Sequence, residues 1–281
     1  MRDQTFMTLV RLLPRAALSR AVGAATRVRA PASLHRVVMR RFARAYHVQL
    51  DEADRPLEGY HTFSEFFSRG LKEGARPIDA GERTVISPVD GIVSEAGVIE
   101  RGECVQAKGL VFPVAELLGD PAAAQSFSDQ GCFATLYLSP RDYHRVHAPL
   151  GGAITGWRYL PGELWPVNPA SVRSVPGLFA LNERLVTWLE TPAGRCAVVM
   201  VGATCVGRIR ATYDDVLGQS GRPASARTYA SPLPLAKGAE LGRFEMGSTV
   251  ILLFAARRVA WDASLYSGAR VTMGRRIGEV R

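Results

Sequence analysis

The chain has 281 residues, of which 47% are hydrophobic and 22% are charged. This length suffices for one large domain or two modest ones, and this composition is typical of globular proteins rather than disordered chains. No apolar run reaches the roughly 18 residues that a membrane-spanning helix needs. The best candidate, residues 196–207, is shorter and is interrupted by Gly202 and Thr204. The composition therefore argues against a helical transmembrane span.

The formal net charge of +9 is concentrated at the start of the chain. Residues 1–50 contain ten Arg, no Lys and one acid, Asp3, whereas the rest of the chain carries 25 basic and 25 acidic residues. A local excess of Arg beside apolar residues indicates an anionic partner surface, either lipid headgroups or nucleic acid.

Cysteine spacing and the N-terminal pattern both indicate a cytoplasmic location. The four cysteines are widely spaced and form no CxxC pair: Cys104, Cys132, Cys196 and Cys205. Neither a zinc site nor a disulfide framework is indicated, and we expect reduced, buried thiols. The N-terminal Arg residues are scattered rather than placed ahead of an apolar block, so the segment is a poor secretory signal.

Two helices are predicted in the basic N-terminal segment. Apolar residues recur at helical spacing over residues 6–22 with Pro14 as an interruption, and a second helix is predicted after Pro31 with Ser33 as its N-cap. This second helix would have a basic face and an apolar face. The basic face carries Arg36, Arg40 and Arg44, and the apolar face carries Leu34, Val37, Val38, Phe42, Ala45 and Tyr46. The pattern is typical of a helix in the plane of a membrane surface. An ordinary core-covering helix with a solvated Arg face is the alternative, and nucleic-acid binding is disfavoured because stacking aromatics are sparse.

The remaining chain reads as an α+β fold. Residues 51–62 are polar and predict a linker, and a short helix is predicted over residues 63–67. Further on, short apolar or β-branched runs alternate with Gly, Pro and Asp turns, which predicts many short strands. These strands lie at residues 85–86, 91–93, 98–99, 132–138, 154–157, 185–189, 197–201 and 250–254, with a helix over 114–118. We predict a mostly antiparallel β catalytic domain with flanking helices, residues 61–281, after amphipathic membrane-docking helices and a linker, residues 1–60.

Two histidines lie in a loop after the predicted strand 132–138. His144 and His147 belong to residues 139–149, and a loop positioned by a rigid strand is where catalytic side chains tend to lie. Imidazoles titrate near neutral pH and can act as acid or base. A pair of metal ligands is an alternative, although no zincin pattern or cysteine cluster completes a shell. A purely structural role for both histidines is equally open.

Asp90 and Ser248 supply the other groups that nucleophilic chemistry needs. Asp90 lies in a turn over residues 87–91, and a carboxylate is the usual orienting partner of a catalytic histidine. Gly247 precedes Ser248 directly before an apolar run, and glycine lets the hydroxyl approach its carbonyl carbon, so the peptide could become an ester. Each segment alone is an ordinary turn. Together, Ser248, one histidine and Asp90 can form a nucleophile, a base and an orienting group.

Several blocks in a fixed order carry a family resemblance. They are residues 66–69 with 75–78, 87–91, 137–149, 160–162 with 167–169, 182–184, 201–204 with 206–207, and 237–240 leading into 244–249. Through these blocks the chain resembles the bacterial phosphatidylserine decarboxylases, pyruvoyl-dependent, membrane-associated proenzymes of the prokaryotic type I-like kind. Met246 stands where the family most often has Leu, an apolar replacement of similar volume.

The resemblance implies a role for each candidate residue. Asp90, His147 and Ser248 would form the triad for self-cleavage between Gly247 and Ser248, and His144 would donate a proton in decarboxylation. Ser248 would become the covalent pyruvoyl cofactor, with no metal and no nucleic acid required. The products, residues 1–247 and 248–281, would form a heterodimer that dimerises further. The basic helices would dock on anionic phospholipid at the cytoplasmic face of the cell membrane, as in a peripheral protein.

Residue chemistry and resemblance combine into one expected mechanism. His147, held by Asp90, would deprotonate Ser248, whose oxygen would attack the Gly247 carbonyl; elimination from the ester and loss of ammonia would leave a pyruvoyl group. This ketone would form a Schiff base with the amine of phosphatidylserine and take up the electrons released with CO2. His144 would protonate the remaining carbon, and hydrolysis would release phosphatidylethanolamine, a step of phospholipid biosynthesis.

Other functions remain open at the level of the sequence. Asp90, His144 and His147 could surround a metal in a hydrolase, or the chain could be a membrane-binding homologue that never matures. A decarboxylase acting on another serine-headed lipid or a soluble amino acid is the nearest rival. The basic amphipathic start argues against a soluble substrate.

Overall fold

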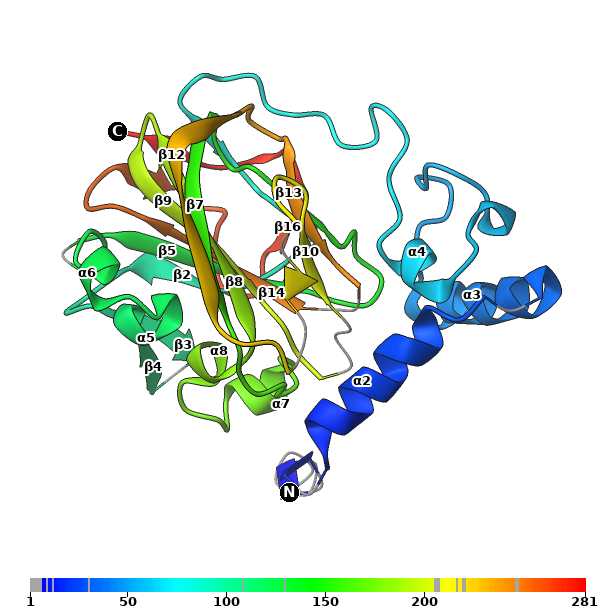
Figure 1. Ribbon diagram of the computed structural model, residues 1–281. Helices are drawn as coiled ribbons and strands as arrows, with labels where there is room; N and C mark the ends of the chain where they lie inside the picture. Colours follow the sequence, from blue (N-terminus) through cyan, green and yellow to red (C-terminus); the bar gives the residue numbers. More distant parts are fainter. Residues whose placement is uncertain are drawn as a thin grey trace.

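The computed structural model describes residues 7–8, 10–11, 13–29, 31–107, 109–128, 130–204, 208–215, 217–218, 221–245 and 248–281. Antiparallel sheets form the body of the molecule, and the N-terminal helices extend from one side of it (Figure 1). The mixed, mostly antiparallel architecture with few helices confirms the predicted fold class at this level.

The largest sheet has eight strands and contains the C-terminal apolar run at its centre. In spatial order its strands are β12 (Ser225–Leu235), β7 (Gly152–Leu160), β8 (Arg184–Thr191), β9 (Gly194–Val201), β14 (Ser248–Phe254), β5 (Cys132–Leu138), β2 (Gly91–Val98) and β16 (Arg270–Val271). Each neighbouring pair is antiparallel. Residues 250–254 of β14 are fully buried, as expected of a central strand covered on both faces.

Smaller sheets pack around the large one. One contains β11 (Leu217–Gly218), β10 (Ile209–Ala211), β13 (Glu240–Phe244) and β6 (Arg145–His147), in that order. Another contains β1 (Thr84–Ile86), β17 (Arg276–Val280) and β15 (Val259–Trp261), and β3 (Glu103–Ala107) pairs with β4 (Leu110–Pro113). Short helices cluster at one corner: α5 (Val114–Leu118), α6 (Pro121–Ala124), α7 (Pro169–Val172) and α8 (Leu178–Leu181) (Figure 1).

The N-terminal helices match the predicted positions with one correction. Pro14 is the N-cap of α2 (Arg15–Thr26), so it interrupts the helical pattern as expected. The second helix, α3 (Ala32–Tyr46), has Pro31 as its N-cap and no side-chain capping bond. The prediction that Ser33 is the N-cap is therefore wrong. Pro31 can occupy this position because it lacks the N–H group that an N-cap would otherwise leave unsatisfied, and Ser33 lies in the first helical turn.

The segment predicted as a linker packs against α3. Met39 and Ala43 of α3 form a buried cluster with Val48, Tyr60 and Phe66, close to the short 3-10 helix η1 (Leu57–Gly59) and to α4 (Phe63–Phe67). The Tyr60 hydroxyl donates a hydrogen bond of 2.7 Å to Asp54. Polar composition alone did not show that this segment buries an aromatic anchor.

The predicted strands are present, and the structure adds others that the sequence pattern did not indicate. The helices over residues 63–67 and 114–118 and the strand over 132–138 have the predicted bounds. The two runs at 91–93 and 98–99 belong largely to one strand, β2. Strand β12 was not predicted because it is polar, mostly exposed and contains proline, which an edge strand tolerates.

Candidate active site

The loop between β5 and β6 carries His144, and His147 is the last residue of β6. The turn of this loop is closed by Asp142, whose Oδ2 accepts hydrogen bonds from the backbone N–H and the hydroxyl of Ser139 at 2.8 and 2.6 Å. This local closure is the usual behaviour of Asp in turns. It presents Tyr143 and His144 on the buried side, where both are at most 5% exposed.

His147 is held between a carbonyl and a phenol. Its Nδ1 lies 2.8 Å from the carbonyl oxygen of Gly238, and its Nε2 lies 3.0 Å from the Tyr143 hydroxyl. A carbonyl only accepts, so Nδ1 carries the proton and Nε2 accepts from Tyr143. Gly238 has a φ of +77°, which favours glycine at the position that orients this ring. Burial lowers the pKa of His147, and the nearby Asp90 and Glu240 charges oppose that effect in part.

His144 is fully buried and also has its tautomer set by a carbonyl. Its Nδ1 donates to the backbone oxygen of Asp142 at 2.8 Å, and its ring lies 4.1 Å from the ring of Phe67, centroid to centroid. Nε2 is buried and has no hydrogen-bond partner among the described residues. Burial lowers the pKa of His144 to about 3. The ring is therefore neutral near pH 7, with a free lone pair on Nε2.

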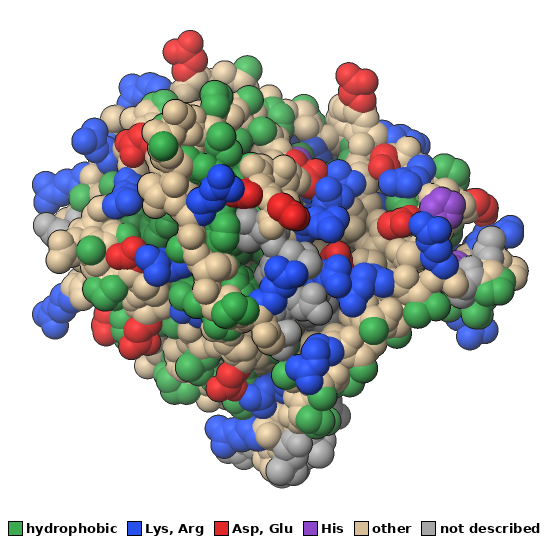
Figure 2. Space-filling model, viewed as in Figure 1, with side chains coloured by type: hydrophobic (Ala, Val, Ile, Leu, Met, Phe, Trp, Pro, Cys, Tyr) green, Lys and Arg blue, Asp and Glu red, His purple; other side chains and the backbone are tan. Residues whose placement is uncertain are grey.

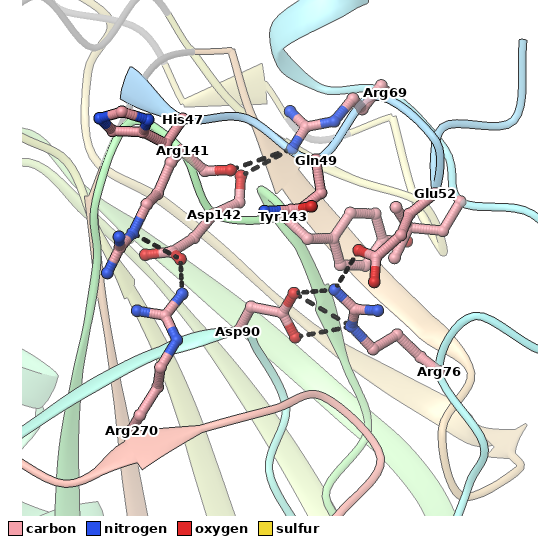
Figure 3. Close-up of a pocket in the computed structure, with 11 residues that line it drawn as sticks. His47, Gln49, Glu52, Arg69, Arg76, Asp90, Arg141, Asp142, Tyr143 and Arg270 are labelled. Carbon is pink, nitrogen blue, oxygen red and sulfur yellow. Dashed lines mark hydrogen bonds and ion pairs between the residues drawn. The ribbon is translucent and has the colours of Figure 1, made fainter. Parts of the chain in front are cut away.

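Asp90 is bound by an arginine rather than by a histidine. Arg76 donates from Nε and Nη2 to the Asp90 carboxylate at distances between 2.6 and 3.1 Å (Figure 3). The backbone N–H of Met273 donates to the same carboxylate at 2.8 Å. Arg76 also reaches Glu52 at 2.8 Å. Gly91 lets this turn approach β5, because a Cβ there would lie 2.5 Å from the Tyr137 oxygen.

Asp90 lies near His147 without being hydrogen-bonded to it. The backbone N–H of His147 donates to the Pro88 oxygen at 2.9 Å, which places the turn of Asp90 beside His147. In the part of the chain that the structure describes, Asp90 and His147 share no side-chain hydrogen bond. Their relation is electrostatic, since the Asp90 charge raises the pKa of His147 against the larger effect of burial.

Ser248 begins β14 at the end of the large sheet where β5 ends. Its backbone pairs with Leu138, the last residue of β5, and the loop that carries His144 and leads into β6 starts at the next residue. Gly247 and Met246 lie outside the described residues, as does the side chain of Ser248. The following Thr249 has a buried hydroxyl without a hydrogen-bond partner in the described part.

A cavity of about 360 Å³ opens beside these residues (Figure 3). Its walls come from the end of α3, the segment after it, the residues following α4, the Asp90 turn, the β5–β6 loop and β16: His47, Gln49, Glu52, Arg69, Leu71, Arg76, Asp90, Arg141, Asp142, Tyr143 and Arg270. Reasoning from the sequence did not assign Arg69, Arg76 or Tyr143 a role. All three lie in blocks that carried the family resemblance, which was the available signal.

The described residues contain neither a metal-binding cluster nor a helix that could span a membrane. No group of three or more His, Cys, Asp or Glu side chains there is arranged to hold a metal ion. Among the same residues, no helix is long and apolar enough to cross a bilayer. Cys104, Cys132 and Cys196 are free and buried, and Cys205 lies outside the described residues.

This chain belongs to the phosphatidylserine decarboxylase family, a family of carboxy-lyases: the family model matches residues 63–279. It is 59% identical over 280 residues to a phosphatidylserine decarboxylase proenzyme of Myxococcus xanthus (strain DK1622), with 100% of both chains covered. It is 58% identical over 281 residues to the proenzyme of Anaeromyxobacter sp. (strain K), covering 99% of each. The proenzyme of Acinetobacter baumannii (strain AYE) is 42% identical over 279 residues, covering 99% of this chain and 97% of that one.

Proposed function

We propose that this chain is a proenzyme that cleaves itself between Gly247 and Ser248 and then converts phosphatidylserine to phosphatidylethanolamine and CO2. The observation that carries the proposal is the position of Ser248. It opens β14 against Leu138, the loop that follows Leu138 supplies His144, and β6, directly after that loop, ends at His147. The nucleophile thus starts a strand beside the end of β5, from which the chain runs through both imidazoles within nine residues.

His147 is suited to act as the base in self-cleavage. Its Nδ1–H is engaged by Gly238, so the lone pair that can take a proton is on Nε2, now held by the Tyr143 hydroxyl. Burial keeps the ring neutral and able to accept a proton. Asp90 contributes its charge, which stabilises the imidazolium that forms, and Arg76 holds Asp90 in place.

The residues around Ser248 fit a pyruvoyl group formed from it. Thr249 and His144 each have a buried polar atom without a described partner, and buried polar groups normally have one. When formed, the pyruvoyl group supplies a ketone that binds the substrate amine and accepts the electrons released with CO2. These two atoms, Thr249 Oγ1 and His144 Nε2, are the proposed polar contacts for that group and for the substrate.

His144 both accepts and donates a proton in this proposal. Its pKa of about 3 makes the imidazolium rare near pH 7, so Nε2 first takes the proton that the ammonium group of the substrate must lose. The same proton is then returned to the carbon from which CO2 has left. The role of donor expected from the family resemblance therefore follows a step in which His144 is an acceptor.

The two product chains, residues 1–247 and 248–281, stay associated as a heterodimer in this proposal. Strand β14 lies between β5 and β9 and is paired with both along its length. Its residues 250–254 are fully buried, so separating the chains would expose a central strand. A further dimer of this heterodimer is part of the proposal and is carried by the family resemblance.

The region of α2 and α3 is proposed to dock on an anionic phospholipid surface as a peripheral segment at the cytoplasmic face of the membrane. Leu34, Val37 and Val38 of α3 are 45 to 55% exposed. The Arg-rich face beside them allows contact with lipid headgroups while apolar side chains insert. We assign residues 1–60 to this segment and residues 61–281 to the decarboxylase domain.

The intact mass of the purified protein under denaturing conditions tests the proposal. We expect two chains, residues 1–247 and 248–281, with the smaller one lighter than its sequence by one ammonia and blocked at its N-terminus. Ser248→Ala should give one chain of full mass and no release of CO2 from phosphatidylserine. A wild-type protein that stays uncut would refute self-cleavage.

A further inference from the structure

We propose that Arg69 binds the phosphodiester of the lipid headgroup in the cavity beside the two histidines. This inference rests on the proposed function and identifies the contact that positions its substrate. Arg69 follows α4 and lines the cavity together with Tyr143 (Figure 3). The Tyr143 hydroxyl donates to His147.

The guanidinium of Arg69 is buried with most of its donors unused. The residue is 3% exposed, and its Nη2 donates to the backbone oxygens of Arg141 and Asp142 at 3.1 and 3.5 Å. Its Nε and Nη1 are buried and have no hydrogen-bond partner among the described residues. Arg69 also makes no ion pair within that part of the chain. A buried cation in this state is costly unless an anion joins it.

Arg184 shows what a structural buried arginine looks like in the same molecule. It is 6% exposed, and each of its three nitrogens donates to a backbone carbonyl: Nε to Leu117 at 2.6 Å, Nη1 to Asn182 at 2.8 Å and Nη2 to Glu116 at 2.7 Å. Arg69 is buried to a similar extent, but its Nε and Nη1 have no hydrogen-bond acceptor among the described residues. The difference indicates that its free donors serve a ligand.

The other arginines that line the cavity already face carboxylates. Arg76 binds Asp90 and Glu52. Arg270 lies 2.6 Å from Asp142, and Arg141 lies 3.9 Å from the same carboxylate. Among the described arginines that line the cavity, Arg69 is therefore the one without an acidic partner, and an incoming anion meets unused donors there.

The headgroup of phosphatidylserine offers two anions, and the reaction distinguishes between them. Binding the carboxylate through an arginine would stabilise the charge that must disappear as CO2 leaves, which would slow the reaction. Binding the phosphodiester holds the substrate without opposing that change. Only an oxygen and a methylene group separate the phosphorus from the reacting carbon.

The position of Arg69 agrees with this choice. The backbone oxygen of Asp142 accepts from both Arg69 Nη2 and His144 Nδ1. A phosphodiester on Arg69 would therefore place the adjoining carbon close to His144. The charge of Arg69 adds to burial in lowering the pKa of His144. A bound phosphodiester would offset that charge and favour proton uptake by His144 at the time it is needed.

The test compares Arg69→Met and Arg69→Lys with the wild type. The substrate is a short-chain phosphatidylserine, and the second probe is glycerophosphocholine, which has a phosphodiester but neither a carboxylate nor a primary amine. We expect Arg69→Met to mature into the same two chains. Its KM, its inhibition constant for glycerophosphocholine and the calorimetric Kd of that probe should each rise about 10- to 100-fold, with a smaller change in kcat. Arg69→Lys should lie between, and Arg222→Met, at an exposed position outside the cavity, should match the wild type.

Three other outcomes are possible, and each would reject either the role of Arg69 or the proposed function. A raised KM with unchanged glycerophosphocholine binding would assign the carboxylate to Arg69 and overturn the proposal. Failure of both Arg69 variants to mature would assign Arg69 to folding or self-cleavage and would overturn it as well. If the wild type stays uncut but binds glycerophosphocholine through Arg69, the proposed function fails and the phosphodiester site remains.

Discussion

At the scale of single residues, backbone carbonyls determine the state of both histidines. Gly238 holds Nδ1–H of His147 and Asp142 holds Nδ1–H of His144, so both rings present Nε2 as the basic atom. Burial keeps both rings neutral. A neutral imidazole has a lone pair free to take a proton, as the proposed self-cleavage and amine deprotonation require, and the burial that keeps it neutral also makes it a weaker base.

The buried His144 should make the protein less stable in mild acid. The unfolded chain binds a proton at His144 near pH 6.5, whereas the folded chain does so only near pH 3. Below pH 6.5 the unfolded state therefore binds more protons, and the free energy of unfolding falls as the pH falls. We expect a contribution of about 1 kcal/mol for each pH unit between pH 6 and 4.

Urea unfolding in a Ser248→Ala background, which keeps one chain, measures this contribution. His144→Gln should flatten the dependence of stability on pH over that interval. Glu183 acts in the opposite direction, because burial raises its pKa to about 7 and the folded state then binds more protons between pH 4.5 and 7. Glu183→Gln should therefore steepen the loss of stability in acid. Equal slopes for His144→Gln and its parent would contradict the assigned state of His144.

At the scale of elements, the short helix α4 links the N-terminal region to the site. Thr62 caps it by accepting from the Glu65 N–H at 3.1 Å, and the Glu65 carboxylate accepts from the His61 N–H at 2.9 Å. Phe66 of this helix packs with Met39 of α3, and Phe67 lies against His144. A helix of five residues depends on such caps and packing, because it is too short to be stable alone.

Loss of the cap should weaken this link. Thr62→Ala is expected to lower the free energy of unfolding by about 1 kcal/mol, the usual contribution of an N-cap hydroxyl. Urea denaturation in the Ser248→Ala background measures the change. Thr228→Ala, at an exposed position of the edge strand β12, should change stability by less than about 0.5 kcal/mol. Equal effects of the two substitutions would show that the cap does not stabilise α4.

At the scale of the whole molecule, the exposed apolar surface is concentrated in residues 13–50, which contain α2 and α3 and are called the N-terminal arm below. Seven of the thirteen large apolar side chains that are exposed in the described chain lie between Leu13 and Leu50. Figure 2 shows Lys and Arg side chains beside apolar ones over this arm. An exposed apolar stripe next to Arg suits a membrane surface better than bulk water.

Substitution tests this surface better than deletion does. Removing residues 1–50 would also remove Met39, Ala43 and Val48 from the cluster that covers Tyr60 and Phe66. The triple variant Arg36→Gln, Arg40→Gln, Arg44→Gln should instead keep the fold and self-cleavage. Its partition coefficient onto anionic phospholipid vesicles should fall roughly 100-fold, at about 1 kcal/mol for each Arg.

A second triple Arg→Gln variant, with the same change in net charge, serves as the control for this prediction. Arg222, Arg257 and Arg281 are exposed and lie outside the N-terminal arm, so their replacement by Gln should leave binding to the vesicles within a few-fold of the wild type. Equal losses for both triple variants would indicate attraction by total charge and would reject α3 as the docking face.

Local sequence patterns determined the backbone elements and the choice of candidate residues. The alternation and length of the apolar runs predicted α4, α5 and β5 with their observed bounds, because a strand or a helix is specified by neighbours a few residues away. The turn before Gly91, the two histidines and Ser248 were chosen by residue type and by family resemblance. Pairing of β14 with β5 then placed Ser248 opposite Leu138, and pairing of β6 with β13 fixed the strand that ends at His147.

Only the tertiary structure decided what each of these side chains contacts. His147 meets Gly238 and Arg69 meets the backbone of Asp142, across separations of 91 and 73 residues. Asp90 binds Arg76 instead of the expected histidine. Such partners follow from how β6, β13 and the turn after α4 pack together, and no local periodicity encodes them. The unused donors of Arg69 exist for the same reason: packing removed water from the guanidinium and supplied no protein acceptor in its place.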